Sequence, residues 1–272
     1  MEKKYRLGDE DFAINVDGHK LRRIIALKDF GTIEKDDVGG FVESEENLSQ
    51  EGDCWISDYG MVFGNAVVRE DAYVFDGAKL YGNAVAQGRS RVYENAKVYG
   101  NSIIYGYAVV FGDSEIFGNA SIYGSSLVCV KAQVFGNASV NGNAVINGRS
   151  KVFGNAKVEG KAHISENARI YENSIIQGNA EVYGKAKVLG IAKVDGYAKI
   201  GGNAIVESHK DYIVFNNWWS SGRYFTWTKS NDMWTVGCFY GSGKKLVGKA
   251  YKDSELSGKE YKRIVDYVKS IK

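Results

Sequence analysis

Three histidines, His19, His163 and His209, are the residues of this 272-residue chain best suited to general acid–base chemistry. A positioned imidazole can take a proton from a nucleophile and return it to a leaving group. His163 has Glu181 eighteen residues further on, whereas His19 and His209 are far from it in the sequence. The chain shows no paired carboxylates, no Ser/His/Asp arrangement and no Gly-rich phosphate loop before a helix. Because a solitary, exposed histidine is more often inert, we predict no catalytic residue.

The cysteines indicate neither a disulfide framework nor a metal site. Cys54, Cys129 and Cys238 are far apart and odd in number, and no CxxC or Cys/His cluster accompanies them. The sequence therefore predicts no bound metal and no cofactor.

Residues typical of binding surfaces are concentrated near the C-terminus. Four of the five tryptophans fall within 17 residues, beside basic residues and a tyrosine. Such clusters are typical of protein-binding hot spots, although a small domain would also use them as its core, and aromatics with basic residues can stack on nucleic-acid bases. The predicted partner-binding residues are Trp218, Trp219, Arg223, Tyr224, Trp227, Lys229 and Trp234.

A six-residue repeat fills the middle of the chain. Stepping by six from Ile56 to Val206, 24 of 26 positions are Val or Ile, and all 24 positions from Ala66 to Ala204 are Ala or Ser. A helix of 3.6 residues per turn would scatter these positions around its axis, whereas short strands joined by turns keep them on one inward face. The absence of proline also favours hydrogen-bonded strands, because proline cannot donate to a sheet ladder. Three strands of six residues make a triangular coil of 18 residues.

This pattern resembles the hexapeptide-repeat left-handed β-helix, whose unit is aliphatic, Gly, any, any, small, any. Here the Gly stands one place later, as in VYGNSI at 98–103. The resemblance implies an all-β fold, a single-stranded left-handed β-helix of about eight coils of 18 residues. Many proteins of this class are acyltransferases that use a histidine base at a cleft or loop beside the coil. No loop interrupts this coil to form such a pocket, so the resemblance alone leaves the activity open.

The coil has three outward faces of different character. The aromatic face carries a ladder of rings eighteen residues apart, the solvated face is mostly polar, and the mixed face includes His163. Contiguous apolar surface of this length favours a contact with a second copy or another protein, although ring stacking alone would also stabilise a flat sheet. The predicted self-association residues are Phe63, Tyr81, Tyr99, Phe117, Phe135, Phe153 and Tyr171.

The two ends of the chain depart from the repeat and are expected to cap it, since open strand edges polymerise. We predict an N-terminal cap at 1–55 with a hairpin at Asp17-Gly18, the β-helix at 56–206, and a C-terminal α+β domain at 207–272. In the last segment, strands precede an amphipathic helix at KEYKRIVDYVKSI. Residues 207–272 have a net charge of +5, against +2 for the whole chain.

The sequence favours a non-catalytic rod that binds a macromolecule in the cytoplasm, since it contains no leader and no long apolar run. The whole arrangement, including GGFVESEENLSQ at 39–50 and the tail of WTVGCF at 234–239 with its helix, also resembles uncharacterised phage and prophage β-helix proteins. This resemblance implies a host protein, in a defence or nucleic-acid-processing complex, as the partner. Nucleic acid is a less favoured partner, and no membrane is expected. The alternatives are a hexapeptide-class acyltransferase and a self-assembling scaffold.

Overall fold

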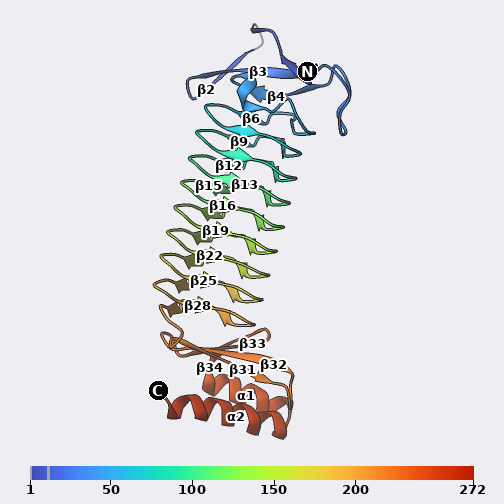
Figure 1. The fold of residues 1–272 in the computed structure, drawn as a ribbon. Coiled ribbons are helices and arrows are strands. Elements are labelled where there is room, and N and C mark those ends of the chain that lie inside the picture. The colour runs from blue at the N-terminus through green and yellow to red at the C-terminus, as the bar shows by residue number, and fades with distance from the viewer. Residues whose placement is uncertain (1, 11–12) are drawn as a thin grey trace.

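The computed structural model describes residues 2–10 and 13–272 and shows a β-solenoid of about nine turns with a non-repeating segment at each end (Figure 1). Each strand of the coil pairs in parallel with the strand three further on, so residues eighteen apart face each other, as Val152 and Ile170 do. The predicted all-β helical fold is confirmed, including the small N-terminal sheet and the helical C-terminal segment.

Three parallel sheets form the walls of the coil. On the aromatic face lie β6 (Met61–Val62), β9 (Lys79–Leu80), β12 (Lys97–Val98), β15 (Glu115–Ile116), β18 (Gln133–Val134), β21 (Lys151–Val152), β24 (Arg169–Ile170), β27 (Lys187–Val188) and β30 (Ile205–Val206). On the solvated face lie β7 (Val67–Val68), β10 (Val85–Ala86), β13 (Ile103–Ile104), β16 (Ser121–Ile122), β19 (Ser139–Val140), β22 (Lys157–Val158), β25 (Ile175–Ile176) and β28 (Lys193–Val194). On the mixed face lie β5 (Trp55–Ile56), β8 (Tyr73–Val74), β11 (Arg91–Val92), β14 (Val109–Val110), β17 (Leu127–Val128), β20 (Val145–Ile146), β23 (His163–Ile164), β26 (Glu181–Val182) and β29 (Lys199–Ile200).

The interior of the coil consists of the residues that the repeat placed there. In each short strand after β5 the second residue is buried and the first points outward, because successive side chains of a strand alternate between its faces. In β5 both Trp55 and Ile56 are buried. The Ala or Ser two places before the buried residue is buried as well, so each corner is filled by a small side chain. Five of the six buried serines recover a hydrogen bond locally, as the Ser114 hydroxyl does by donating to the carbonyl of Phe111 at 2.8 Å, whereas the Ser90 hydroxyl has no partner among the described residues.

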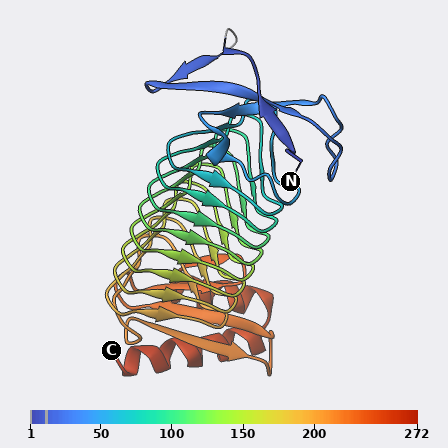
Figure 2. The same ribbon diagram turned by 45° about the horizontal axis from the view of Figure 1, so that its top comes forward.

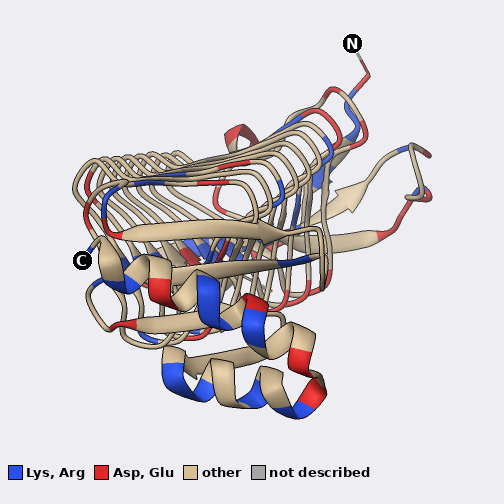
Figure 3. Cartoon of the chain, turned by 90° about the horizontal axis from the view of Figure 1, so that it is seen from below, with Lys and Arg blue, Asp and Glu red and all other residues tan. Residues whose placement is uncertain are grey.

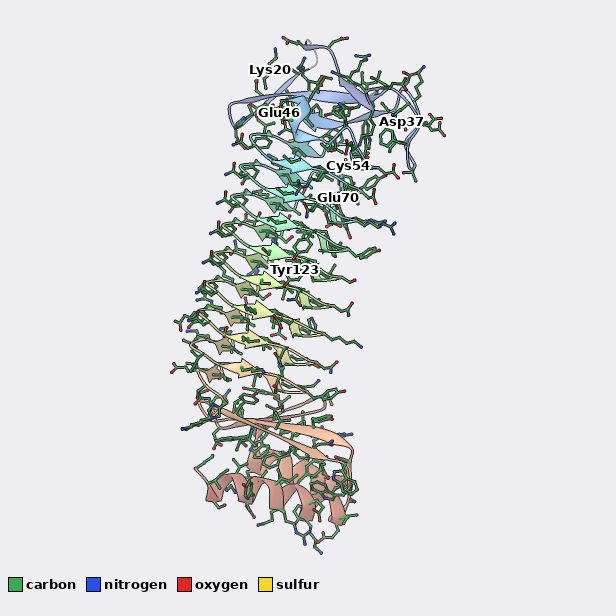
Figure 4. The ribbon with its side chains drawn as sticks, viewed as in Figure 1. Lys20, Asp37, Glu46, Cys54, Glu70 and Tyr123 are labelled. Carbon is green, nitrogen blue, oxygen red and sulfur yellow. The ribbon has the colours of Figure 1, made fainter. Side chains whose placement is uncertain are left out.

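Outside the coil, equivalent side chains of successive coils stack on one another (Figure 4). The rings of the aromatic face lie 4.7–5.2 Å apart between centroids and within a few degrees of parallel. At the adjacent corner, asparagine amides donate to the side-chain carbonyl of the next coil, as Asn101 does to Asn119 at 3.0 Å. These ladders add side-chain contacts to the backbone pairing along the coil axis.

The N-terminal segment lies across the first coil (Figure 2). Its elements are β1 (Tyr5–Leu7), β2 (Ile14–Val16), β3 (His19–Ala26), β4 (Val38–Val42) and the 3-10 helix η2 (Glu45–Asn47). Strands β2 and β3 form the predicted hairpin, with positive φ at Asp17 and Gly18. Strand β4 is antiparallel to β3 but parallel to β6, so the parallel pairing of the coil extends upstream of residue 56.

A buried lysine closes this end of the coil. Lys4 is 1% exposed, and its Nζ donates to the carbonyl oxygens of Gly52 and Cys54 at 3.0 and 3.1 Å. These are backbone acceptors at the first coil, which has no preceding coil of the repeat to pair with. Lys4 therefore satisfies buried polar groups that would otherwise lack partners.

The C-terminal domain is a four-stranded antiparallel sheet with two helices at the far end of the coil (Figures 1 and 3). Its elements are β31 (Tyr212–Asn217), β32 (Arg223–Thr228), β33 (Met233–Val236), β34 (Phe239–Ser242), α1 (Gly243–Asp253) and α2 (Glu255–Ser270). The sheet and the helices share a separate apolar core. In Figure 3, Lys and Arg are seen along both helices, where the positive charge of the tail is concentrated.

Hydroxyl groups of the C-terminal segment satisfy the open edge of the last coil. The backbone N–H of Lys199 donates to Thr226 Oγ1 at 2.9 Å, and that of Ile205 donates to Ser230 Oγ at 2.7 Å. The Tyr212 hydroxyl in turn donates to the carbonyl of Lys193 at 2.9 Å. The domain is therefore hydrogen-bonded to the last coil, and this fixes it beside the neighbouring side chains of the mixed face. None of the described helices is long and apolar enough to cross a membrane.

Candidate functional site

A groove beside His163 is the strongest candidate site, because it collects side chains with different chemistry from two parts of the chain. His163, Glu181 and Lys199 face one another in register on β23, β26 and β29 of the mixed face. The turn between β33 and β34 supplies the opposite wall. The groove has a volume of about 320 Å³ and is lined by His163, Ser165, Glu166, Glu181, Tyr183, Lys199, Gly237, Cys238 and Tyr240.

The groove lies where one outward position of the mixed face lacks a side chain at the last coil. Gly201 stands where the preceding coil has Tyr183, and a Cβ at this glycine would lie 2.5 Å from the tyrosine ring. The Tyr183 ring therefore occupies this space, and its hydroxyl reaches Thr235 Oγ1 of the C-terminal sheet at 3.4 Å. Tyr240 likewise packs against Gly202. A larger residue at either glycine would push the tail away from the coil.

Two side-chain contacts involve ionisable residues of the groove. The side-chain Nδ2 of Asn147 donates to His163 Nε2 at 3.1 Å and orients the ring, and the half-buried imidazole otherwise faces the groove. Glu181 forms an ion pair with Lys199 at 2.8 Å. Glu181 is paired in register with His163 on the next coil.

Two tyrosines add hydrogen-bond donors to the groove. Burial raises the pKa of Tyr183, and burial together with the neighbouring Tyr183 raises the pKa of Tyr240. Both phenols therefore keep their protons at neutral pH and can donate to a developing negative charge. Among residues 2–10 and 13–272, no group of three or more His, Cys, Asp or Glu side chains could hold a metal ion. The histidine and the two phenols supply proton transfer and hydrogen bonding.

The other two histidines do not share this setting. His19 Nδ1 contacts the Glu43 carboxylate at 2.9 Å on the N-terminal hairpin, and its ring packs on Phe63. His209 is exposed in the turn that leaves the coil. The sequence predicted that His163 points outward and that Glu181 is its neighbour. The pairing register agrees with both predictions. The tail that encloses them has no counterpart in the repeat pattern.

The seven residues predicted to bind a partner do not form one surface. Trp227 and Trp234 are 4% and 2% exposed and belong to the core of the C-terminal domain. The ring of Tyr224 stacks on Tyr197 of the last coil, 4.3 Å between centroids. Trp218 and Trp219 are exposed, at 77% and 49%, at the loop between β31 and β32.

The two basic members of this set, Arg223 and Lys229, are exposed at opposite ends of β32. The set therefore divides between core packing, contact with the coil and solvent. A partner that binds the exposed tryptophans could contact only one of the two basic residues. The predicted hot spot is therefore smaller than the sequence suggested.

The predicted self-association residues do form one continuous row. Phe63 is buried, because Leu21 and Phe41 of the N-terminal segment pack with it. The remaining six rings, from Tyr81 to Tyr171, are half-buried by their stacked neighbours. Stacking within the chain covers the ring faces, and the ring edges remain at the surface. Association through this row stays a prediction.

No family model matches the chain. Over 73 residues it is 42% identical to a protein of Escherichia coli (strain K12) named uncharacterized acetyltransferase YdcK. The matched stretch is 24% of this chain and 22% of that protein, so the chain spans about a fifth of the length of this relative.

This likeness corrects two expectations drawn from the sequence. A relative named as an acetyltransferase contradicts the prediction of a non-catalytic interaction protein, and with it the prediction of no enzymatic activity. It favours the hexapeptide acyltransferase alternative instead. The resemblance to phage and prophage proteins, and the host complex it implied, gain no support. The prediction of no catalysis treated His163 as solitary and solvated. In the structure, the C-terminal domain forms one wall of a groove beside His163.

Proposed function

We propose that the protein is an acyltransferase of the hexapeptide-repeat class, with His163 as general base in the groove between coil and C-terminal domain. The observation that carries the proposal is the presence of His163, beside a carboxylate and two phenols, in a groove of about 320 Å³ on a repeat coil. The likeness to a relative named acetyltransferase supports a thioester such as acetyl-CoA as the donor.

The groove residues have complementary roles in such a transfer. His163 takes the proton from the acceptor's O–H or N–H while the acceptor atom attacks the thioester carbonyl. The oxygen of the tetrahedral intermediate gains negative charge, which the hydroxyls of Tyr183 and Tyr240 can stabilise by donating hydrogen bonds. When the C–S bond breaks, the imidazolium returns the proton to the leaving thiolate.

The test is acyl transfer by the purified chain from acetyl-CoA to a panel of acceptors, with free coenzyme A measured by chromatography. His163→Gln should lower kcat by about 10²–10⁴-fold, the usual contribution of a general base. His209→Gln is the matched control, because His209 is exposed outside the groove.

Direct transfer also predicts that Cys238→Ser, at the groove wall, keeps its activity. Loss of activity in Cys238→Ser together with acetylation of Cys238 in the wild type would replace direct transfer by a covalent route. Full activity in His163→Gln, or no acyl transfer by the wild type, would contradict the proposal.

A further inference from the structure

Glutamates stand at several corners of the coil where most repeats have glycine. Glu70, Glu94, Glu166 and Glu172 all adopt positive φ, between 57° and 61°. This left-handed region is unfavourable for residues with a Cβ, so each glutamate replaces a residue that would fit at lower energy. A compensating interaction is expected wherever such a residue stands.

Two of these glutamates have such an interaction within the chain. Glu70, labelled in Figure 4, accepts a hydrogen bond from the backbone N–H of Gly88 on the next coil at 2.9 Å. Glu172 accepts the equivalent bond from Gly190 at 2.8 Å. Each carboxylate therefore joins two coils. These two glutamates have a structural role.

Among the described residues, the carboxylates of Glu94 and Glu166 lack such a bond, although Gly112 and Gly184 stand at the equivalent places on the next coils. Glu94 lies outside the groove, so position and not the missing bond distinguishes Glu166. Glu166 is instead a wall of the groove that contains His163. The second carboxylate of the groove, Glu181, is already neutralised by Lys199 at 2.8 Å. The exposed Glu166 is thus the carboxylate of the groove that no basic side chain pairs with among the described residues, and a cationic group is its natural counterpart.

We propose that Glu166 binds the ammonium group of the acceptor, so that the acceptor class is a primary amine; this rests on the proposed acyltransferase function. The ammonium loses one proton to solvent, and the free amine attacks the thioester carbonyl to form the C–N bond while His163 takes the nitrogen's second proton. The C–S bond then breaks, and the imidazolium returns that proton to the leaving thiolate. The products are an amide, a thiol and the one proton released to solvent.

The experiment compares amines with alcohols of the same skeleton, using the full chain and acetyl-CoA. The pairs are ethanolamine with ethylene glycol, 1,4-diaminobutane with 1,4-butanediol, and glucosamine with glucose. Glu166→Gln keeps the size of the side chain and removes its charge. Glu94→Gln is a matched control, because Glu94 has the same corner on the same face four coils away, with φ of 57°.

We expect the amines to be the better acceptors, with Glu166→Gln raising KM for amines about tenfold, the scale of a charged hydrogen bond. KM for any alcohol that reacts, and all constants of Glu94→Gln, should stay unchanged. Preference for alcohols, or equal effects of the two substitutions, would overturn the assignment.

A binding measurement separates this inference from the proposed function. The ring signals of His163, one of three histidines, are followed by NMR as 1,4-diaminobutane or 1,4-butanediol is added. Shifts with the diamine that weaken in Glu166→Gln support amine binding even where no acyl transfer is found, in which case the acyltransferase proposal fails alone. Acyl transfer to alcohols without a Glu166-dependent response to the diamine overturns the amine assignment alone.

Discussion

The stacking of corners can be tested by placing alanine at two glycines that share a backbone conformation but differ in what lies above them. Gly184 and Gly196 have φ of 73° and 64°. A Cβ on Gly184 would lie 2.6 Å from the carbonyl oxygen of Gly202 and 2.8 Å from its nitrogen. A Cβ on Gly196 meets no atom within 4 Å, because this corner belongs to the last coil.

The two substitutions should therefore differ in the free energy of unfolding. Both place alanine in the left-handed region, which costs about 1 kcal/mol. Gly184→Ala also forces a methyl group into backbone atoms held by ladder hydrogen bonds, and overpacking of this kind costs about 1–3 kcal/mol more. We expect about 1 kcal/mol for Gly196→Ala and about 2–4 kcal/mol for Gly184→Ala.

Urea unfolding followed by far-ultraviolet circular dichroism measures both values on the same chain. Only the difference between the variants is interpreted, since repeat proteins do not always unfold in one step. Equal destabilisation by the two alanines would refute the reasoning, because the φ penalty would then explain the glycines without any contact between coils.

Two further predictions concern the ends and the faces of the coil. Burial raises the pKa of Asp211, but hydrogen bonds from backbone N–H groups and from the Ser208 hydroxyl outweigh it and hold the pKa below its ordinary value. The stabilisation that ionised Asp211 provides is present above the unfolded pKa of about 4 and is lost as pH falls through the folded pKa. Asp211→Asn should therefore make the free energy of unfolding less dependent on pH below pH 4, measured by tryptophan fluorescence. Phe117→Lys with Phe135→Lys should lower the particle mass measured by light scattering and leave the circular dichroism spectrum unchanged. Asn141→Lys on the solvated face should change neither. An unchanged mass in the double variant would argue against association through the aromatic face.

The coil was predictable because every repeat contains the residue types that the coil needs. The inward Val, Ile, Ala and Ser positions are buried as expected, and the eighteen-residue register follows from the period. The row of stacked rings from Phe63 to Tyr171 was predictable for the same reason, since equal positions on successive coils must meet. The hairpin at Asp17-Gly18 depended on a local turn signal that needs no long-range information.

Features that depend on contacts between distant segments were not predictable. Helix α1 includes glycines at 243 and 248, which weaken the helical signal, and packing against the sheet overrides that propensity. Strand β4 pairs in parallel with β6 although its own sequence lacks the repeat. The division of the tryptophans between core and surface likewise depends on how the tail folds, because composition alone is the same in both cases.

The candidate site illustrates why a periodic fold places chemistry where its period ends. Along the mixed face each coil presents its side chains to solvent in nearly the same way, so a histidine on a middle coil would have neighbours above and below but no opposite wall. At the last coil, Gly201 replaces an outward side chain and the open edge must be hydrogen-bonded by another segment. The segment that does this also brings the β33–β34 turn within reach of His163. Capping and site formation are thus consequences of the same contact, and a substitution that loosens the C-terminal domain should affect both.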